Sequence, residues 1–82
     1  MKEIEWSEAS RADIRRIDQK TAMRIFETLL RFAKTGEGDV KKLKAGDVEY
    51  RLRVGDYRVR FTEQPAGRLH IHAVRHRREA YR

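Results

Sequence analysis

The 82-residue sequence contains no cysteine, a single proline and no long apolar run. The absence of cysteine excludes disulfide bonds, thiolate metal sites and thiol nucleophiles. A membrane-spanning helix needs roughly 20 consecutive apolar residues, so we expect no membrane partner. The polar segment 1–8 is also unlike a secretory signal. These features predict one domain, residues 1–82, located in the cytoplasm.

Charged residues are abundant, but the two signs are distributed unevenly along the chain. Residues 1–40 contain eight Lys or Arg and eight Asp or Glu, whereas residues 41–82 contain twelve and five, so the net charge of +7 lies entirely in the C-terminal half. Nine of those twelve cations are arginine, which binds phosphate and carboxylate through paired hydrogen bonds. This asymmetry indicates a polyanionic or acidic partner. The alternative is solvated charge that keeps a small domain soluble.

The first half of the sequence predicts one short strand and two helices. Residues 2–6 favour a strand, and Ser7 is a suitable N-cap for a helix that ends near Asp18. Apolar residues then recur with helical spacing from Thr21, with Asp18 as N-cap and Gly36 at the left-handed position after the last turn. The apolar stripe of this second helix is expected to face the core.

The second half of the sequence changes to a period of two. Residues 36–47, with three glycines and three lysines, are expected to form a basic connecting loop. Alternating apolar and charged residues flank Gly55-Asp56, which predicts a β-hairpin with a two-residue turn. The predicted strands occupy residues 48–54, 57–61 and 69–73. The resulting order, β-α-α-β-β-β, defines an α+β fold in which two helices pack on one face of a small antiparallel sheet.

The hairpin places four arginines on one face of the sheet. A two-residue turn sets Val54 opposite Tyr57, and the register then puts cation opposite cation. The four residues, called the arginine face below, are Arg51, Arg53, Arg58 and Arg60. Like charges opposite one another destabilise a sheet by up to ~1 kcal/mol per pair, which a bound anion would offset. The alternative is that Glu49, Asp56 and Glu63 neutralise the face from its rim.

A basic segment with aromatic rings follows the last strand and contains His76, Arg77 and Tyr81. Guanidinium groups bind phosphate and rings stack on bases in RNA recognition, although a solvated terminus is the alternative. His70 and His72 border the arginine face, but no third ligand has a recognisable spacing, so we predict no metal site. The further candidates for contact with RNA are Lys41, Lys42, Lys44, Arg60, Arg75, Arg78 and Arg82.

Cleavage of RNA without a metal requires a base, cations that hold the phosphate, and an acid for the leaving oxygen. Arginine, with a pKa above 12, can supply only the charge. Proton transfer is therefore expected from His76, Tyr81 or Glu49. Neighbouring arginines favour the phenolate form of a tyrosine, which makes Tyr81 a candidate base.

The element order, the segment YRLRVGDYRVRF at 50–61 and the segment VRHRREAYR at 74–82 resemble the RelE/ParE superfamily of bacterial type II toxin–antitoxin toxins. The resemblance spans nearly the whole chain and is closer to the RelE branch. It implies a ribosome-dependent mRNA endonuclease that cuts in the A site without a metal or other cofactor and leaves a 2′,3′-cyclic phosphate. It also implies an acidic antitoxin partner and contact with operator DNA only through the toxin–antitoxin complex.

The resemblance also implies roles for individual residues. Matched by position, the catalytic residues are Arg51, Arg53, Arg58, Arg77 and Tyr81. Some relatives carry lysine at the positions of Arg51 and Arg53, and lysine can act as a base where arginine cannot. The base is therefore expected to be Tyr81 or His76. Two other functions remain open: inhibition of DNA gyrase in the manner of ParE, and nucleic-acid binding without catalysis.

Overall fold

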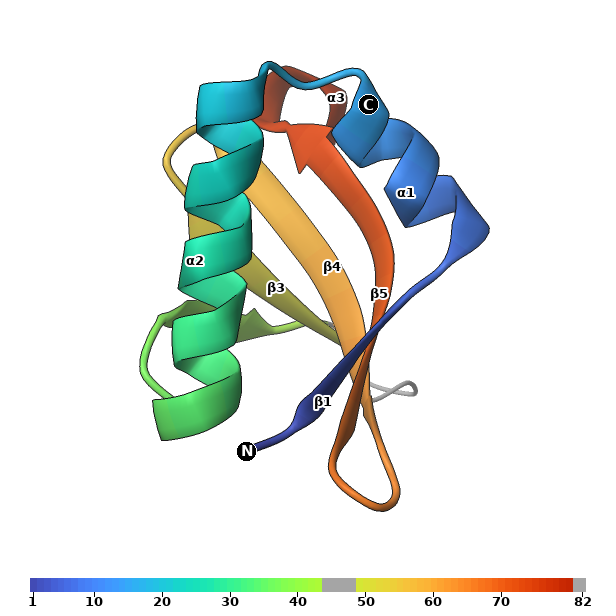
Figure 1. Ribbon diagram of the computed structural model, residues 1–82, viewed down its shortest axis with the longest axis vertical. Helices are drawn as coiled ribbons and strands as arrows, with labels where there is room; N and C mark the ends of the chain where they lie inside the picture. The colour runs from blue at the N-terminus through green and yellow to red at the C-terminus, as the bar shows by residue number, and fades with distance from the viewer. Residues whose placement is uncertain (44–48, 81–82) are drawn as a thin grey trace.

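The computed structural model describes residues 1–43 and 49–80 of the chain, which form one five-stranded sheet and three helices (Figure 1). The elements are β1 (Glu3–Trp6), α1 (Glu8–Arg15), α2 (Gln19–Thr35), β2 (Asp39–Lys42), β3 (Glu49–Val54), β4 (Tyr57–Gln64), β5 (Arg68–His76) and α3 (Arg77–Ala80). The strand order across the sheet is β1-β5-β4-β3-β2. The predicted α+β class is confirmed. No helix in the described ranges is long and apolar enough to cross a membrane.

Both main helices begin at the predicted caps. The side chain of Ser7 accepts a hydrogen bond from the backbone N–H of Ser10, and that of Asp18 accepts one from Thr21. Each cap satisfies a backbone donor that has no partner within the helix. Helix α2 ends at Gly36, whose φ of 78° is the left-handed conformation that glycine adopts at low cost. Helix α1 ends at Arg15, slightly earlier than predicted.

The sheet differs from the prediction in two places. Strand β1 pairs in parallel with β5, so the sheet is mixed rather than wholly antiparallel. Residues 39–42, predicted as part of a loop, form strand β2 and pair with β3. This strand was missed because Val40, opposite Leu52, is its single apolar residue. Lysines are common on such short edge strands because their charge discourages pairing with other chains.

Strands β4 and β5 are also longer than predicted. Strand β4 continues to Gln64, and β5 continues to His76, where it is still paired with Tyr57. Alternation stops being visible in the sequence before the pairing ends, because β4 ends in the polar residues Thr62, Glu63 and Gln64 and β5 ends in Arg75 and His76. The single turn of α3 follows directly.

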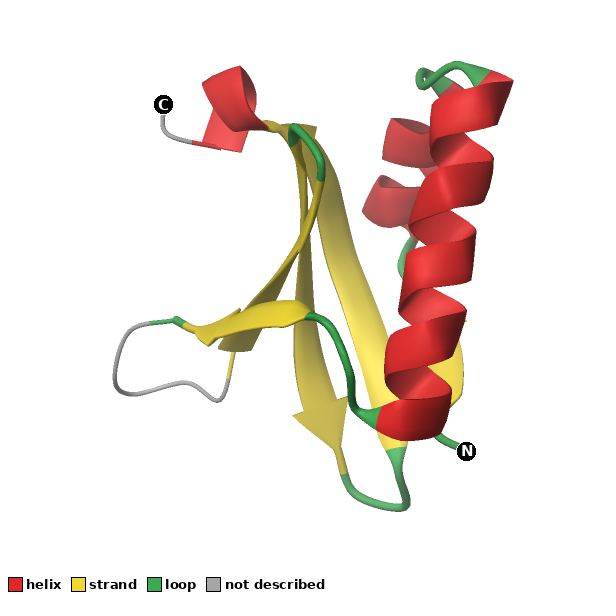
Figure 2. Cartoon of the chain, turned by 90° about the vertical axis from the view of Figure 1, so that its left-hand side faces the viewer, coloured by secondary structure: helices red, strands yellow, loops and turns green. Residues whose placement is uncertain are grey.

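The hydrophobic core lies between α2 and one face of the sheet. Helix α2 contributes its apolar stripe, as predicted, and the strands contribute the alternate residues that face it. The buried members are Ala22, Ile25, Leu29, Ala33, Leu52, Val54, Val59, Phe61, Leu69, Ile71 and Val74. Figure 2 shows α1 and α2 together on this side, whereas the short α3 lies on the other side. That other face, called the open face below, is covered by no long helix of the described residues.

A buried carboxylate joins α1 to the edge of β5. Strand β1 pairs with β5 only as far as Ile71, so the N–H of Val74 has no strand partner on that side. Oδ2 of Asp13 accepts a hydrogen bond from this N–H at 2.9 Å, and Oδ1 accepts one from Arg16 at 2.9 Å. Arg75 Nε lies 3.5 Å from Oδ2. Asp13 thus fixes α1 against the sheet.

Candidate nucleic-acid interface

The hairpin register matches the prediction at every pair that defines the arginine face. Arg53 lies opposite Arg58, and Arg51 lies opposite Arg60. The residues between them in β3 and β4, Leu52 and Val59, are buried toward the helices. Because side chains alternate across a strand, the four arginines belong to the open face of the sheet.

Neighbouring strands extend this face into two rows of cations. In the first row Arg58 lies between Arg53 on β3 and Arg75 on β5, with Asp39 of β2 at the far end. In the second row Lys41 of β2 lies opposite Arg51, next to Arg60. The structure therefore brings Lys41, one of the predicted RNA contacts, onto the arginine face. Arg75, another of them, continues the first row in register, with its Nε 3.5 Å from Asp13 of α1.

Arg58 is the most unusual member of the face because it is buried. Only 9% of the residue is exposed, and its Nη1 donates to the backbone oxygens of Gly55 and Tyr57, each at 3.2 Å. Its Nε is buried without a hydrogen-bond partner, and no carboxylate of the described residues lies within ion-pair distance. A buried cation without a counter-charge is costly, and a bound anion would relieve that cost.

The turn of the hairpin orients a second guanidinium toward Arg58. Arg53 Nε donates to the carbonyl oxygen of Gly55 at 3.3 Å, the same oxygen that accepts from Arg58. Gly55 has a φ of 60°, in the left-handed region that favours glycine. The turn conformation thus places one carbonyl oxygen where both guanidinium groups converge.

The rim carboxylates neutralise this face only in part. Glu49 Oε1 lies 2.6 Å from Arg60 Nη2 and 2.8 Å from Arg60 Nε. Glu63 pairs with Lys2 at 2.9 Å, and Asp56 lies 4.0 Å from Arg77. Neutralisation of the face by carboxylates at its rim, the alternative predicted from the sequence, therefore holds for Arg60. It also makes Glu49 a weaker candidate base, because Arg60 is bound to one of its two carboxylate oxygens.

His76 and the residues after it lie at the hairpin turn rather than on the arginine face. His76 is opposite Tyr57, and the two rings meet edge to face with centroids 5.3 Å apart. Its Nδ1 accepts a hydrogen bond from the N–H of Arg78 at 3.3 Å. The N–H of Arg77 donates to the carbonyl oxygen of Asp56 at 2.7 Å. A hollow of about 510 Å³ is lined by Asp56, His76, Arg77 and Arg78.

The other predicted site residues lie elsewhere. Lys42 is exposed on β2 opposite Tyr50, so it belongs to the opposite side from the arginine face. Lys44, Tyr81 and Arg82 lie outside the described residues.

Two histidines on β5, His70 and His72, form a polar network with residues of neighbouring strands. His70 Nδ1 donates to Glu5 Oε1 at 2.8 Å, and His72 Nε2 lies 3.0 Å from Thr62 Oγ1. The two rings meet edge to face with centroids 4.7 Å apart. The described residues contain no group of three His, Cys, Asp or Glu side chains that could hold a metal ion. The spacing His-x-His was visible in the sequence, but the contacts with Thr62 and Glu5 were not.

Burial lowers the pKa of His72 below its ordinary value of 6.5, and the charges of His70 and Arg60 lower it further. The carboxylate of Glu49 acts in the opposite direction. His72 is therefore neutral at physiological pH, which leaves one ring nitrogen able to accept a proton.

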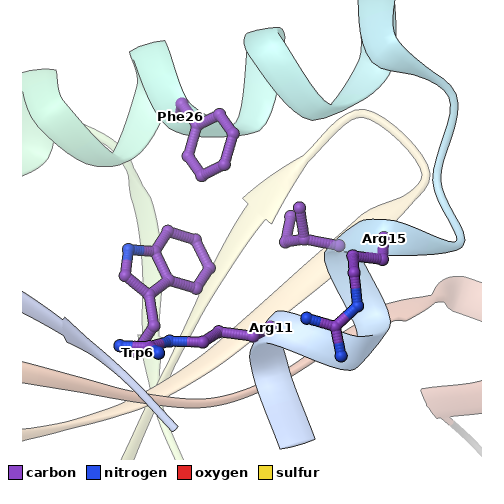
Figure 3. A pocket seen from close by; sticks show the side chains of 5 residues that line it. Trp6, Arg11, Arg15 and Phe26 are labelled. Atoms are coloured by element: carbon purple, nitrogen blue, oxygen red, sulfur yellow. The ribbon is translucent and has the colours of Figure 1, made fainter. Parts of the chain in front are cut away.

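A separate apolar cleft of about 300 Å³ lies between α1 and α2 (Figure 3). Trp6 and Phe26 point toward one another across it, with ring centroids 5.3 Å apart, and Arg11 and Arg15 extend from α1. Ile14 completes the lining. The cleft offers no group that could transfer a proton, so it is not the candidate site.

Comparison with known proteins identifies the class of this fold and site as a toxin of a type II toxin–antitoxin system. The sequence model of the family described as "ParE toxin of type II toxin-antitoxin system, parDE" matches residues 4–81. The chain belongs to this family, and the predicted membership of the RelE/ParE superfamily is confirmed. No curated protein sequence gives a significant match.

Solved structures of similar fold come from archaea and bacteria. The RelB–RelE antitoxin–toxin complex of Methanococcus jannaschii matches with a TM-score of 0.77 and 21% identity over 94% of each chain. The RelE–RelB complex of Pyrococcus horikoshii OT3 gives 0.78 and 22% over 93% of this chain and 94% of that one. The YoeB dimer of Staphylococcus aureus gives 0.73 and 21% over 92% and 95%. At these identities the likeness concerns the fold.

Proposed function

We propose that the chain is a metal-independent endoribonuclease that cleaves messenger RNA on the ribosome and thereby inhibits translation. The observation that carries the proposal is Arg58, a buried guanidinium in the middle of a row of arginines that forms no ion pair with a carboxylate of the described residues. A phosphodiester of the RNA backbone supplies the missing anion. The sequence predicts no metal or other cofactor, and this fits the proposed activity because stabilisation of a phosphate by arginine requires no metal.

In the proposed reaction the arginines hold the scissile phosphate while its negative charge increases. Arg53 and Arg58 converge at the turn and are suited to bind its non-bridging oxygens. Arg51 and Lys41 continue the cationic surface along the RNA backbone. Arg77 and His76, next to the turn, are placed to contact the leaving side of the same phosphate or the adjacent nucleotide.

The ribosome is proposed to position the substrate. The arginine face is a sheet surface, whose second row is largely exposed, rather than a deep cleft. Such a surface binds phosphates but immobilises a flexible RNA chain poorly, and much of the rate of an intramolecular attack depends on alignment. A ribosome that fixes the mRNA provides this alignment.

An acidic antitoxin is proposed as the neutralising partner, in the cytoplasm, with operator DNA bound only through the toxin–antitoxin complex. Two of the similar structures are RelE toxins bound to RelB. A net charge of +7, concentrated in the C-terminal half of the chain, favours association with an acidic polypeptide.

A second candidate, inhibition of DNA gyrase, is favoured by the family match, which names ParE. In that case the arginine face would bind an acidic protein surface and no RNA would be cut.

The test is induced expression in a bacterial host, with transcript 5′-ends mapped within minutes of induction. We expect cuts inside translated regions, in phase with the reading frame, and their loss in Arg77→Ala. Arg31→Ala serves as the matched control, because Arg31 is an exposed arginine of α2 on the far side of the sheet from the site. Intact transcripts together with a DNA-damage response would favour gyrase instead. Intact transcripts without that response would favour nucleic-acid binding without catalysis.

A further inference from the structure

The hairpin turn is contacted by a third arginine, which comes from the helix layer. Nη1 of Arg24, in the second turn of α2, lies 3.3 Å from the position that a Cβ atom would take on Gly55. Arg53 and Arg58 donate hydrogen bonds to the carbonyl oxygen of the same glycine. Three guanidinium groups therefore meet at one residue of the turn, Arg24 from the helix side of the sheet and the other two from the open face.

The guanidinium of Arg24 is close to the turn but unpaired. Its Nη1, Cζ and Nη2 atoms lie 3.3, 3.6 and 3.7 Å from the Cβ position of Gly55, so the group rests against the glycine. No hydrogen bond or ion pair joins this guanidinium to another of the described residues. Its N–H groups are therefore available to acceptors on a ligand.

Arg24 lines a hollow of about 240 Å³ between the start of α2 and the hairpin turn. Two carboxylates, of Asp18 and Asp56, and two rings, of Tyr57 and His76, also line it. Pockets that hold a whole small molecule usually measure about 300–1,000 Å³. This smaller hollow suits a single ring system.

The lining of the hollow fits a nucleobase better than a phosphate, because carboxylates repel an anion. A hydrogen bond from the backbone N–H of Thr21 to Asp18 Oδ2, 3.0 Å long, lowers the pKa of this carboxyl, so it is ionised and can only accept. A base has N–H donors for a carboxylate, acceptors for a guanidinium and a flat face for stacking on rings. Guanine combines the donors N1–H and N2–H₂ with the acceptors N7 and O6, which a guanidinium binds as a pair.

The hollow adjoins the region where the scissile phosphate is proposed to lie. It shares Asp56 and His76 with the larger hollow that contains Arg77. The guanidinium groups proposed to bind the phosphate contact Gly55 from one side, and Arg24 contacts it from the other. Because β3 ends and β4 begins at this turn, no strand separates the two sides there. An RNA chain bound at the turn can therefore place a flanking base in the hollow.

We propose that this hollow binds a guanine base in a nucleotide that flanks the scissile phosphate, and that Arg24 recognises the base through N7 and O6. The inference rests on the proposed endoribonuclease activity. It makes Arg24 a residue that determines where RNA is cut, without a part in bond breaking. Cleavage is then expected to favour sites with guanine beside the cut.

The experiment compares single-turnover cleavage of two ribosome-bound mRNAs by the purified full-length chain. They carry guanine or 7-deazaguanine at the positions that flank a mapped cut. The analogue has a C–H group in place of N7 and keeps every group used in Watson–Crick pairing, so decoding is unchanged. Loss of one of two paired hydrogen bonds should slow the wild-type protein by about 3–10-fold.

The variant Arg24→Met keeps the length of the stem but has no hydrogen-bond donor. It should cut both mRNAs at one rate, which is lower than the wild-type rate on the guanine mRNA. Arg31→Met, a change of another exposed arginine of α2, is the control and should keep the wild-type preference. Should Arg24→Met fail to fold, Arg24→Lys takes its place, because lysine keeps the charge without the paired N–H groups.

Equal wild-type rates on the two mRNAs would overturn the inference while leaving the endoribonuclease intact. A variant at Arg24 that is slower but keeps the full preference would also overturn it, because Arg24 would then only support the turn. A wild-type protein that cuts neither mRNA would overturn the proposed function and this inference together.

Discussion

Two buried charges in this small protein have opposite surroundings. Asp13, 5% exposed, has partners for both carboxylate oxygens: the N–H of Val74 and the side chains of Arg16 and Arg75. Arg58, 9% exposed, donates to two backbone carbonyls, and among the described residues it has no carboxylate partner and one unpaired N–H. A buried charge whose partners all lie within the chain is satisfied by the fold, and loss of one member of that set is strongly destabilising. A charge that lacks them is available to an external anion.

The difference predicts that substitution of Arg58 affects mainly activity, whereas substitution of Asp13 affects mainly stability. A buried charge that lacks a counter-charge is itself costly, so an apolar side chain of similar length in its place should be neutral or stabilising, whereas removal of one partner of a buried pair is strongly destabilising. The two regions also differ in location, because Asp13 lies where α1 meets the edge of β5, whereas Arg58 lies on the central strand β4 at the end next to the hairpin turn.

The largest expected effect is on the activity of Arg58→Met. Methionine preserves the length of the buried stem but cannot bind phosphate, so cleavage should fall by about 10²–10³-fold, as when one oxyanion-stabilising donor is removed. The free energy of unfolding should change by less than about 1 kcal/mol or increase. Single-turnover cleavage and urea denaturation of the same preparation measure both quantities. Loss of activity that accompanies a loss of several kcal/mol would show that Arg58 is structural.

The second prediction concerns the stability of Asp13→Ala. The substitution leaves the buried N–H of Val74 without an acceptor and removes the partner of Arg16, so unfolding should become easier by about 3 kcal/mol. Glu27→Ala, an exposed change on α2, should alter stability by no more than about 0.5 kcal/mol. Urea denaturation gives both values. An Asp13→Ala chain as stable as the control would remove the contrast with Arg58.

The third prediction is a dependence of stability on pH through His72. Its pKa is lowered in the folded protein, so the unfolded chain binds more protons between that pKa and the ordinary value of 6.5. Stability therefore rises with pH through this window, is lost as the pH falls through it, and changes no further through this group below it. Between neutral and mildly acidic pH, wild-type protein should lose more stability than His72→Gln, measured by denaturation at each pH. Equal losses would mean that His72 titrates as it does in the unfolded chain.

Local features of the sequence predicted much of this fold. The register of the arginine face follows from a two-residue turn, and the starts of α1 and α2 follow from the caps at Ser7 and Asp18, which act over three residues. The parallel pairing of β1 with β5 could not be predicted in this way. It joins residues separated by 65 positions, and nothing in the segment 3–6 specifies a partner strand.

The candidate site was likewise predictable only where local sequence patterns determine it. Alternation predicted which arginines share a face, but not that Arg58 would be the buried one, because that depends on flanking strands and on the turn carbonyls. The β-bulge at His72, which has no opposite residue in β4, was hidden because a strand with an extra residue looks in sequence like a regular strand. The bond from Asp13 to Val74 spans 61 positions and became visible only when α1 packed on β5.

The smallest expected effect concerns Arg60, the arginine of the same face that is paired with Glu49. Arg60 differs from Arg58 in being exposed and bound to Glu49. Because a partly exposed ion pair contributes little, Glu49→Gln should lower stability by less than about 1 kcal/mol. The freed guanidinium can then bind a phosphate, so affinity for RNA should rise at low salt. The slope of log K against log salt should steepen by about one counterion. An unchanged slope would mean that Arg60 lies outside the path of the RNA, and the binding surface would then be limited to the row that contains Arg53, Arg58 and Arg75.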